Sequence, residues 1–212
     1  MTGNIIGRNY VELGLPSGTK WATDNVGAAV PEGYGDYFAW GETSTKETYN
    51  RSTYRYSNGG EVYNLTKYCN NAEYGYNGFT DALTTLEVAD DAAAVNWGSG
   101  WRMPTVDEIQ ERENECTSSR GISTLNGVAG QLITGPNGNS IFLAFAGRRY
   151  SIPTNPSLNI YDVGTVGEFW SGTFREQSKY YYGAYTLTTG YPSLSGHSDR
   201  YHGLPIRPVK SK

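Results

Sequence analysis

Alternation of apolar and polar residues predicts short strands along most of this chain. Tyr10 to Gly14 alternates in this way, and Leu15 to Gly18 forms a Pro-then-Gly turn that leads to a second alternating stretch, Lys20 to Val26. Together they predict a β-hairpin. Gly35 to Gly41, an aromatic stretch bounded by glycines, predicts a further strand. Residues 1–9 show no pattern and are predicted to be an N-terminal arm or linker.

The stretch from Thr43 to Thr85 follows neither the helical nor the strand period for long. It contains polar residues, Asn-Gly pairs and scattered tyrosines. Structureless segments of this length are uncommon in compact domains unless they pack as irregular or functional structure. We therefore expect a long, ordered loop region.

Two short helices are predicted next. Glu87 to Trp97 begins with acidic residues and is followed by Gly98, so a helix is expected there with its Ala and Val side chains facing inward. Thr105 and Glu108 have the spacing of a capping box, which predicts a second helix that runs to about Cys116.

Strand patterns return in the second half of the chain and complete the predicted fold. Gly135 to Gly138 reads as a turn between two of these strands. The predicted strands are Val128 to Thr134, Ser140 to Ala146, Ile160 to Val163, Glu168 to Thr173, Tyr180 to Thr188 and Ile206 to Val209. With no repeat and no second core, residues 10–212 are predicted to form one α+β domain with a mostly antiparallel sheet and two short helices.

Composition narrows the classes of function. The chain has 212 residues, 37% of them hydrophobic, and its 18 tyrosines and 27 glycines suit a surface made polar by hydroxyl groups rather than by charges. A net charge of −4 without a basic stripe argues against nucleic-acid binding. The chain contains no run of about 18 apolar residues, which is the length that would predict a membrane span. Its N-terminus lacks a signal-peptide pattern.

Several blocks of the sequence resemble the Fibrobacter succinogenes major paralogous domain family, which occurs in surface proteins of Bacteroidetes and in some of their phages. The resemblance spans nearly the whole chain. The blocks are LGLPSGTKWA, VGA, PEGYGDYFAWGE, DDAAAVNWGSGWRMPTVDE, GPNGNSIFLAFAG, FWSG and RYHGLPIRPV.

This resemblance implies a C-type-lectin-like fold of the formylglycine-generating-enzyme subtype, in which a long irregular segment presents ligand-binding residues. Members of this fold group also serve as variable proteins of diversity-generating retroelements. The matching variable region would be about Gly172 to His202, where many residues are types that adenine-rich codons can encode.

The stretch from Phe169 to Val209 is the predicted binding segment. Tyr and Arg provide contact area and hydrogen bonds with few ordered torsions, and Ser and Gly adapt around them, as in many binding loops. An ordinary Tyr-rich hairpin is the alternative. The candidate ligand-binding residues are Thr173, Phe174, Arg175, Gln177, Tyr180, Tyr182, Tyr191, Ser193, Ser195, His197, Asp199, Arg200, Tyr201 and His202.

Catalytic and metal-binding alternatives fit the sequence less well. Formylglycine-generating enzymes use a reactive cysteine pair near the C-terminal end, and no cysteine follows Cys116 here. Ser195, His197 and Asp199 lack the strand-turn-helix elbow of many hydrolases. Calcium-binding lectin motifs are absent. No enzyme activity, cofactor or metal is therefore expected.

The remaining conspicuous residues are predicted to be structural. The five tryptophans lie in the family-like blocks next to Gly or apolar residues, which favours core packing over sugar stacking. Arg102 and Arg207 are expected to tie loops through hydrogen bonds. Cys69 and Cys116 could pair or could both be small buried hydrophobic residues, and the sequence leaves both alternatives open.

The expected function is binding of a protein or glycan on a cell surface, by a domain displayed outside the cell or on a virion. The alternative is a structural or adhesin module of a larger surface or fibre protein, without a discrete ligand site. The sequence does not predict an oligomeric state.

Overall fold

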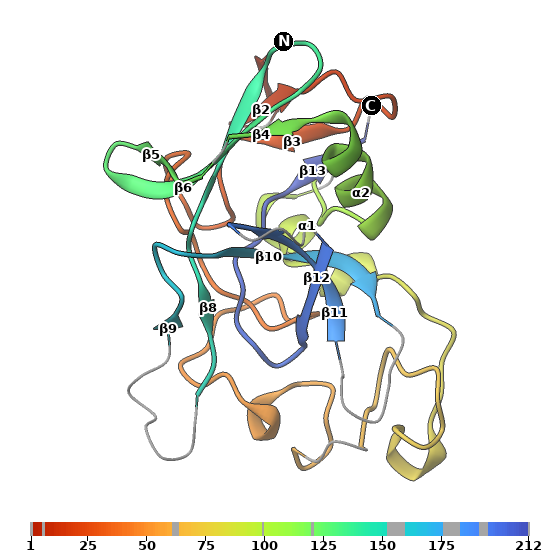
Figure 1. Ribbon diagram of the computed structural model, residues 1–212. Coiled ribbons are helices and arrows are strands. Elements are labelled where there is room, and N and C mark those ends of the chain that lie inside the picture. Colours follow the sequence, from red (N-terminus) through yellow and green to blue (C-terminus); the bar gives the residue numbers. More distant parts are fainter. Residues whose placement is uncertain are drawn as a thin grey trace.

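The computed structural model describes residues 2–5, 7–60, 64–98, 100–119, 121–151, 160–175, 183–190 and 195–211. It contains short, mostly antiparallel strands and two short helices, which confirms the α+β prediction at that level. The two ends of the chain lie close together at one end of the molecule, and the segment after Thr43 reaches the opposite end (Figure 1).

The first sheet joins both ends of the chain. Its strands are β1 (Thr2–Ile5), β2 (Arg8–Glu12), β3 (Lys20–Ala22) and β13 (Val209–Lys210), in that order. The hairpin prediction is confirmed, because β2 pairs with β3 and the amide of Gly18 donates to the carbonyl of Leu15 at 2.9 Å.

The segment predicted to be an N-terminal arm contains a strand. Thr2–Ile5 pairs in register with Arg8–Val11, so residues 2–5 form the edge of the first sheet. Gly7, at φ 73°, supplies the left-handed turn that reverses the chain between the two strands. Backbone hydrogen bonds hold this strand in place. Its residues show no alternation of apolar and polar side chains, so the sequence did not predict it.

A second sheet is built around one long hairpin. It contains β4 (Thr117–Ser118), β5 (Ser123–Leu125), β6 (Val128–Thr134) and β7 (Ser140–Ala144). β6 pairs with each of the other three strands. The predicted turn is present, since the amide of Gly138 donates to the carbonyl of Gly135 at 2.9 Å.

The third sheet and a two-stranded ribbon lie nearest the candidate site. β10 (Gly167–Phe174), β11 (Gly183–Thr189) and β12 (Ser195–Asp199) form the sheet, and β8 (Arg148–Arg149) pairs with β9 (Ile160–Tyr161) in the ribbon. β12 was not predicted, because its five residues are all polar or glycine and show no alternation.

Two predicted strands differ from the structure. Gly35 to Gly41 runs extended but makes only an isolated bridge, between Phe38 and Leu204. The predicted strand Ile206 to Val209 is reduced to the start of β13 at Val209. In both places the backbone forms hydrogen bonds with single residues of segments that are far away in the sequence. It does not pair with a continuous neighbouring strand.

Both predicted helices are present. α1 (Ala92–Trp97) follows a short 3-10 turn, η3 (Val88–Asp90), and Asp91 caps it by accepting from the amides of Ala93 and Ala94. α2 (Val106–Glu115) has the predicted capping box of Thr105 and Glu108 and ends at Cys116.

One detail of the first helix was wrong. Ala92 and Ala93 are buried, as predicted, but Val95 is 52% exposed and Val88 is 77% exposed. α1 is under two turns long, so Ala92, Ala93 and Trp97 already occupy its inward face.

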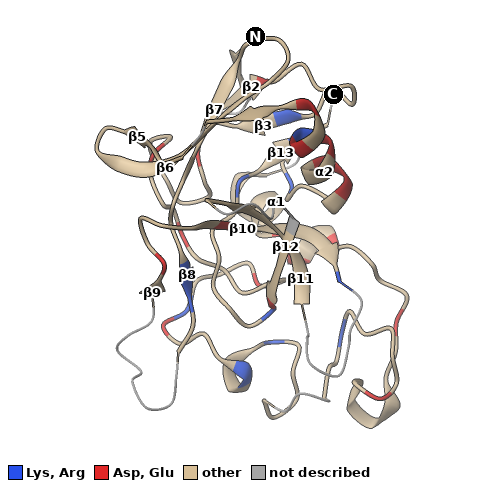
Figure 2. Cartoon of the chain, in the orientation of Figure 1, with Lys and Arg blue, Asp and Glu red and all other residues tan. Residues whose placement is uncertain are grey.

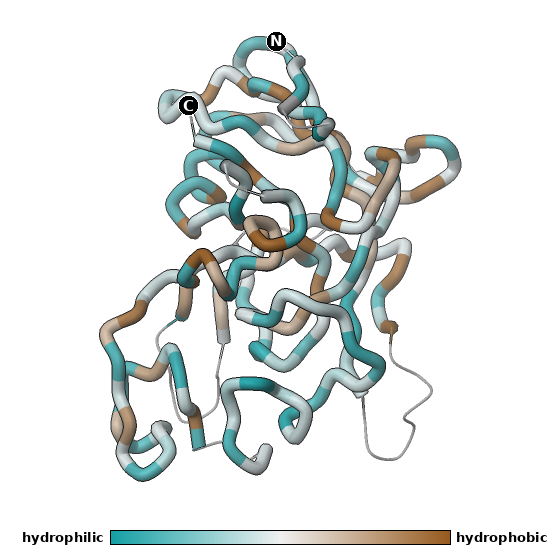
Figure 3. The backbone as a smooth tube through the Cα atoms, turned by 180° about the vertical axis from the view of Figure 1, so that it is seen from behind, coloured by the Kyte–Doolittle hydropathy of each residue, from teal (hydrophilic) through white to brown (hydrophobic). Residues whose placement is uncertain are grey.

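The long loop prediction is confirmed for the described residues of this segment. Residues 43–60 and 64–85 contain only two 3-10 turns, η1 (Arg51–Thr53) and η2 (Tyr76–Gly78). The loops at this end of the molecule are mostly hydrophilic or neutral in hydropathy (Figure 3). Their order comes from tyrosines inserted into the core, namely Tyr49, Tyr54, Tyr56, Tyr68 and Tyr74.

The structural roles predicted for tryptophan and arginine are confirmed. All five tryptophans are buried. Arg102 forms a bidentate pair with Glu108, with both distances 2.6 Å. Arg207 is fully buried and bonds to three carbonyl groups and to Asn25. Cys69 and Cys116 do not form a disulfide with each other.

Candidate ligand-binding cleft

A cleft of about 620 Å³ opens where three distant segments of the chain meet. Small-molecule and saccharide sites are commonly a few hundred Å³ in size, so the cleft has room for a ligand of a few rings. Its described lining consists of Asn50, Arg51, Ser52, Gly60, Arg148, Tyr150, Ser151, Tyr201 and His202. This lining contains aromatic rings, two guanidinium groups and no carboxylate.

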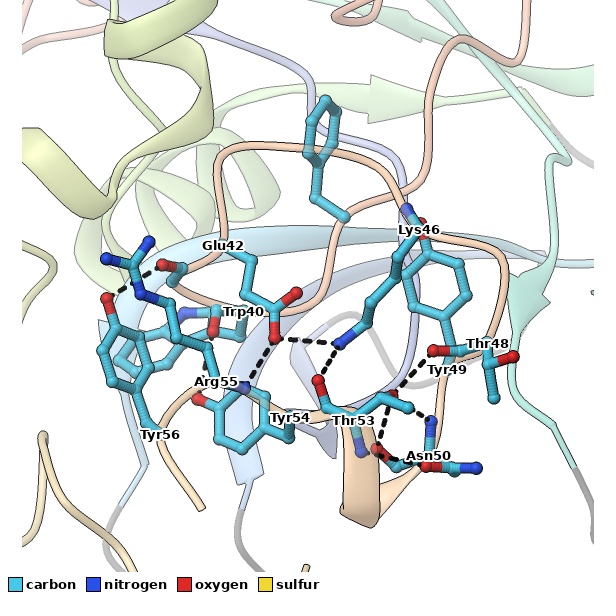
Figure 4. A network of polar contacts seen from close by, with 12 residues as sticks. Trp40, Glu42, Lys46, Thr48, Tyr49, Asn50, Thr53, Tyr54, Arg55 and Tyr56 are labelled. Atoms are coloured by element: carbon cyan, nitrogen blue, oxygen red, sulfur yellow. Dashed lines mark hydrogen bonds and ion pairs between the residues drawn. The ribbon is translucent and has the colours of Figure 1, made fainter. Parts of the chain in front are cut away.

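The first wall is the 3-10 turn η1, which is held by a polar network beneath it (Figure 4). Glu42 is 8% exposed, and its Oε1 accepts from Lys46 Nζ and from the amide of Arg55, both at 2.9 Å. Lys46 also donates to the carbonyl of Thr53. Asn50 caps the turn in a reciprocal capping box with Thr53. These bonds hold the Arg51 backbone in a defined turn.

Burial lowers the pKa of Lys46, while the neighbouring Glu42 carboxylate raises it in opposition. Because the two groups lie 2.9 Å apart, each offsets part of the cost of burying the other's charge. The Glu42–Lys46 pair therefore serves the loop as a partly buried clamp rather than as a ligand site.

Backbone hydrogen bonds join the three walls. The amide of Ser151 donates to the carbonyl of Tyr49 at 2.7 Å, which ties the first wall to the chain after β8. Arg149 and Gly203 exchange two hydrogen bonds, each of 2.7 Å, which ties β8 to the C-terminal segment. The relative positions of Arg51, Arg148 and Tyr201 are consequently set by main-chain pairing.

Aromatic rings form one side of the cleft. Tyr150 stacks on Tyr161 with ring centroids 4.0 Å apart and lies 5.2 Å from the ring of His202. Tyr201 meets the His202 ring edge-on at 4.6 Å, and the Arg51 guanidinium lies 5.6 Å from the Tyr201 ring centroid. Such pairs restrain one another's rotamers, so this side of the cleft is preorganised.

His202 is held as a neutral ring. Burial, with the charges of Arg148 and Arg51, lowers its pKa to about 4, although Asp199 opposes the shift. Its Nδ1 lies 3.0 Å from the hydroxyl of Ser198. At pH 7 the imidazole therefore adds hydrogen-bonding capacity and ring surface to the cleft, without charge.

Behind these residues lies the carboxyl group of Glu168, on β10. Glu168 is 6% exposed, and burial raises the pKa of its carboxyl to about 7, opposed by Arg148 and by the hydroxyls of Ser198 and Thr186. Arg148 Nη1 lies 3.7 Å from this carboxyl. The charge of the Glu168 carboxyl, which faces Arg148 from behind the cleft, therefore changes near neutral pH.

The structure divides the predicted binding residues into two groups. Tyr201 and His202 line the cleft. Thr173 and His197 lie on the other side of the third sheet, where Thr173 Oγ1 accepts from the first amide of α2, that of Val106, and His197 is exposed. Partial desolvation lowers the pKa of the His197 ring, and the nearby charge of Arg175 lowers it further, while Asp199 opposes the shift.

Other predicted residues belong to neither group. Asp199 accepts from the Tyr201 hydroxyl at 2.8 Å and so supports a cleft residue. The backbone of Ser195 pairs with Leu187 in β12. The rest lie outside the described residues, and these are Gln177, Tyr180, Tyr182, Tyr191 and Ser193.

Phe174 and Arg200, which were predicted to contact a ligand, are both buried in the structure. Phe174 is 6% exposed and packs in the core. Arg200 is fully buried: it donates to the carbonyl of Tyr68 at 2.8 Å, and its guanidinium lies 4.9 Å from the Trp40 ring centroid. The residues next to Arg200 in the sequence are mostly polar, so they gave no sign that it is buried. Its guanidinium is stabilised there by the surrounding aromatic rings.

Replacing Arg200 by methionine is therefore expected to act on stability. The loss of its buried hydrogen bonds should lower the free energy of unfolding by about 2–3 kcal/mol, as measured by urea denaturation. Arg55→Met is the matched control, because Arg55 is exposed and should change stability little. An unchanged stability with loss of ligand binding would show that Arg200 acts at the surface instead.

Arg51, Arg148 and Tyr150 were not among the residues predicted from the sequence. Arg148 and Tyr150 directly follow the apolar run before Gly147, and such polar residues at the end of a buried strand were a usable signal. Arg51 had no such signal, because it lies in the segment without periodicity.

Comparisons of the chain with protein-family models, with curated proteins and with solved structures found no match. Within the described ranges, no helix is both long and apolar enough to cross a bilayer.

Proposed function

We propose that this chain is a ligand-binding domain of a surface or phage-associated protein, built on a C-type-lectin-like scaffold. The observation that carries the proposal is the cleft, where Tyr201 and His202 from the predicted binding segment meet Arg51, Arg148 and Tyr150. Tyrosine and arginine are among the residues most enriched at positions that contribute most of the binding energy. The ligand is a protein or glycan on a cell surface, and the C-terminal segment is the part that varies between copies.

Binding without catalysis is the form of this proposal that the chemistry favours. Ser198 is the serine next to a histidine ring nitrogen, but it is only 4% exposed, which leaves no room for a substrate carbonyl at its hydroxyl. Burial also raises the pKa of the Cys116 thiol, which keeps it in the less reactive protonated form.

The test is binding of the purified chain to a panel of bacterial and host cell surfaces. Arg51→Ala combined with Tyr201→Ala should reduce selective binding at least about tenfold, since both side chains line the cleft. Arg55→Ala, on the same loop but outside the cleft lining, should leave binding unchanged. Circular dichroism and thermal unfolding would check that each variant is folded.

Two outcomes would contradict the proposal. Binding that survives the double substitution would place the ligand site elsewhere. A lack of selective binding across a broad panel would instead support a structural module of a larger surface protein.

A further inference from the structure

Arg148 is a cleft residue with hydrogen-bonding capacity that the described part of the chain leaves unused. Its guanidinium lies 3.4 Å from Asp162 and 3.7 Å from Glu168, and it makes no hydrogen bond within the described part of the chain. Its Nε is buried there without a partner. An arginine offers N–H donors in a planar fork, so the exposed donors of Arg148 that form no hydrogen bond remain available to a ligand.

The Arg148 guanidinium lies near both an aromatic ring and other charged groups. Arg148 is 5.8 Å from the Tyr150 ring centroid, and its side chain is 37% exposed, so solvent and ligands can reach it. Figure 2 shows β8 as a basic stretch that lies above the loops at the lower end of the molecule. Arg51, on η1, adds a second positive charge to the cleft lining.

From these contacts we infer that the cleft binds an acidic saccharide, with the carboxylate of the sugar received by Arg148 and the ring lying against Tyr150 and Tyr201. This inference rests on the proposed binding function and names the ligand class of the same cleft. A planar carboxylate matches the arginine fork in a bidentate manner. In an acidic sugar the carboxylate is bonded directly to the ring, so the negative charge lies within a few ångströms of the ring face. In the cleft, the Arg148 guanidinium and the Tyr150 ring are likewise close together.

An acidic peptide fits these contacts less well. Its carboxylates lie on flexible side chains, whose ordering costs free energy on binding, whereas a sugar ring is rigid. The aromatic wall is also suited to the apolar face of a ring. The peptide is kept as a separate arm of the test.

Glu168 should make this binding depend on pH. Above neutral pH its carboxylate competes with the ligand for Arg148, and as the pH falls through about 7 Glu168 becomes neutral. The other groups that face this pair are Asp162, which lies 3.4 Å from Arg148, and the hydroxyls of Ser198 and Thr186, which face Glu168. His202 remains neutral above about pH 5, because its pKa is about 4. Affinity for an acidic sugar should therefore rise between pH 8 and pH 6.

The experiment is isothermal titration of the full chain with a uronic-acid trisaccharide, with the methyl ester of the same trisaccharide and with a tetrapeptide of glutamate. The free acid is expected to bind at least about tenfold more tightly than the ester. Arg148→Gln should remove this preference, and Arg51→Gln should weaken binding of the acid, while Arg55→Gln should leave it unchanged. Thermal unfolding would check the folding of each variant, and the exposed Arg51 variant tests the inference if Arg148→Gln fails to fold.

Glu168→Gln is the matched test of competition. It imitates the protonated carboxyl, so it should tighten binding of the acid at pH 8 and remove the dependence between pH 8 and pH 6. Equal affinity for acid and ester, no binding of either, or an unchanged preference in Arg148→Gln would overturn the inference. Equal binding of the glutamate peptide would overturn the assignment to saccharides.

The two proposals can fail separately. If cell-surface binding depends on Arg51 and Tyr201 but the trisaccharide does not bind, the binding function stands and the ligand class is wrong. If neither assay shows binding, both are wrong.

Discussion

Replacing Arg207 by methionine is expected to lower the free energy of unfolding by about 3–5 kcal/mol. The Arg207 guanidinium is fully buried and donates to Asn25 Oδ1 and to the carbonyls of Ala22, Thr23 and Phe142, over 2.7 to 3.2 Å. Methionine fills a similar volume but leaves these acceptors buried without donors. Urea denaturation of the purified chain would measure the change.

Two further variants separate charge from geometry at this site. Arg207→Lys keeps a cation but cannot reach several acceptors in one plane, so it should recover only part of the lost stability. Arg55→Met, at an exposed position, should stay within about 0.5 kcal/mol of the parent chain. A loss of under about 1 kcal/mol in Arg207→Met would show that the buried acceptors find water or other donors.

Replacing Trp170 by alanine should lower the free energy of unfolding by about 3–5 kcal/mol. Trp170 is fully buried in the core formed with Trp40 and Phe38, and its indole Nε1 donates to the carbonyl of Phe38 at 2.7 Å. In return, the indole of Trp40 donates to the carbonyl of Ser171 at 2.8 Å. This reciprocal pair joins β10 to the extended segment Tyr37 to Trp40, so alanine would leave a cavity and break the junction.

Trp170→Phe is the matched variant, since it keeps an aromatic ring and removes the indole donor. Its expected cost is about 1–2 kcal/mol, smaller than that of alanine. Thermal and urea unfolding of both variants would give the comparison. An equal loss in the two variants would mean that the hydrogen bond to Phe38, rather than the packing of the ring, stabilises this part of the core.

The candidate site was only partly predictable from sequence. Tyr201 and His202 were predicted, because tyrosine and histidine between two strands of a glycine-rich segment have the composition of a binding loop. Arg200, their neighbour, has the same sequence context but is buried against Trp40. Composition describes a segment as a whole and does not say which side of the chain each residue faces.

Several parts of this structure are determined by interactions between residues that are close together in the sequence. The capping box of Thr105 and Glu108, the stop at Gly98 and the hairpin β6–β7 are set by bonds and alternation within a few residues, and the sequence predicted all three. The burial of the tryptophans was likewise predictable, because large apolar rings gain most from leaving water.

The tertiary structure alone decided the pairing of β1 and β12, the burial of Arg200, and the meeting of Arg51, Arg148 and Tyr201 in one cleft. Each of these depends on backbone groups or charges that bond to partners far along the chain, as Arg149 does with Gly203. Backbone donors are the same at nearly every residue, so the sequence carries no local sign of which distant partner they will find.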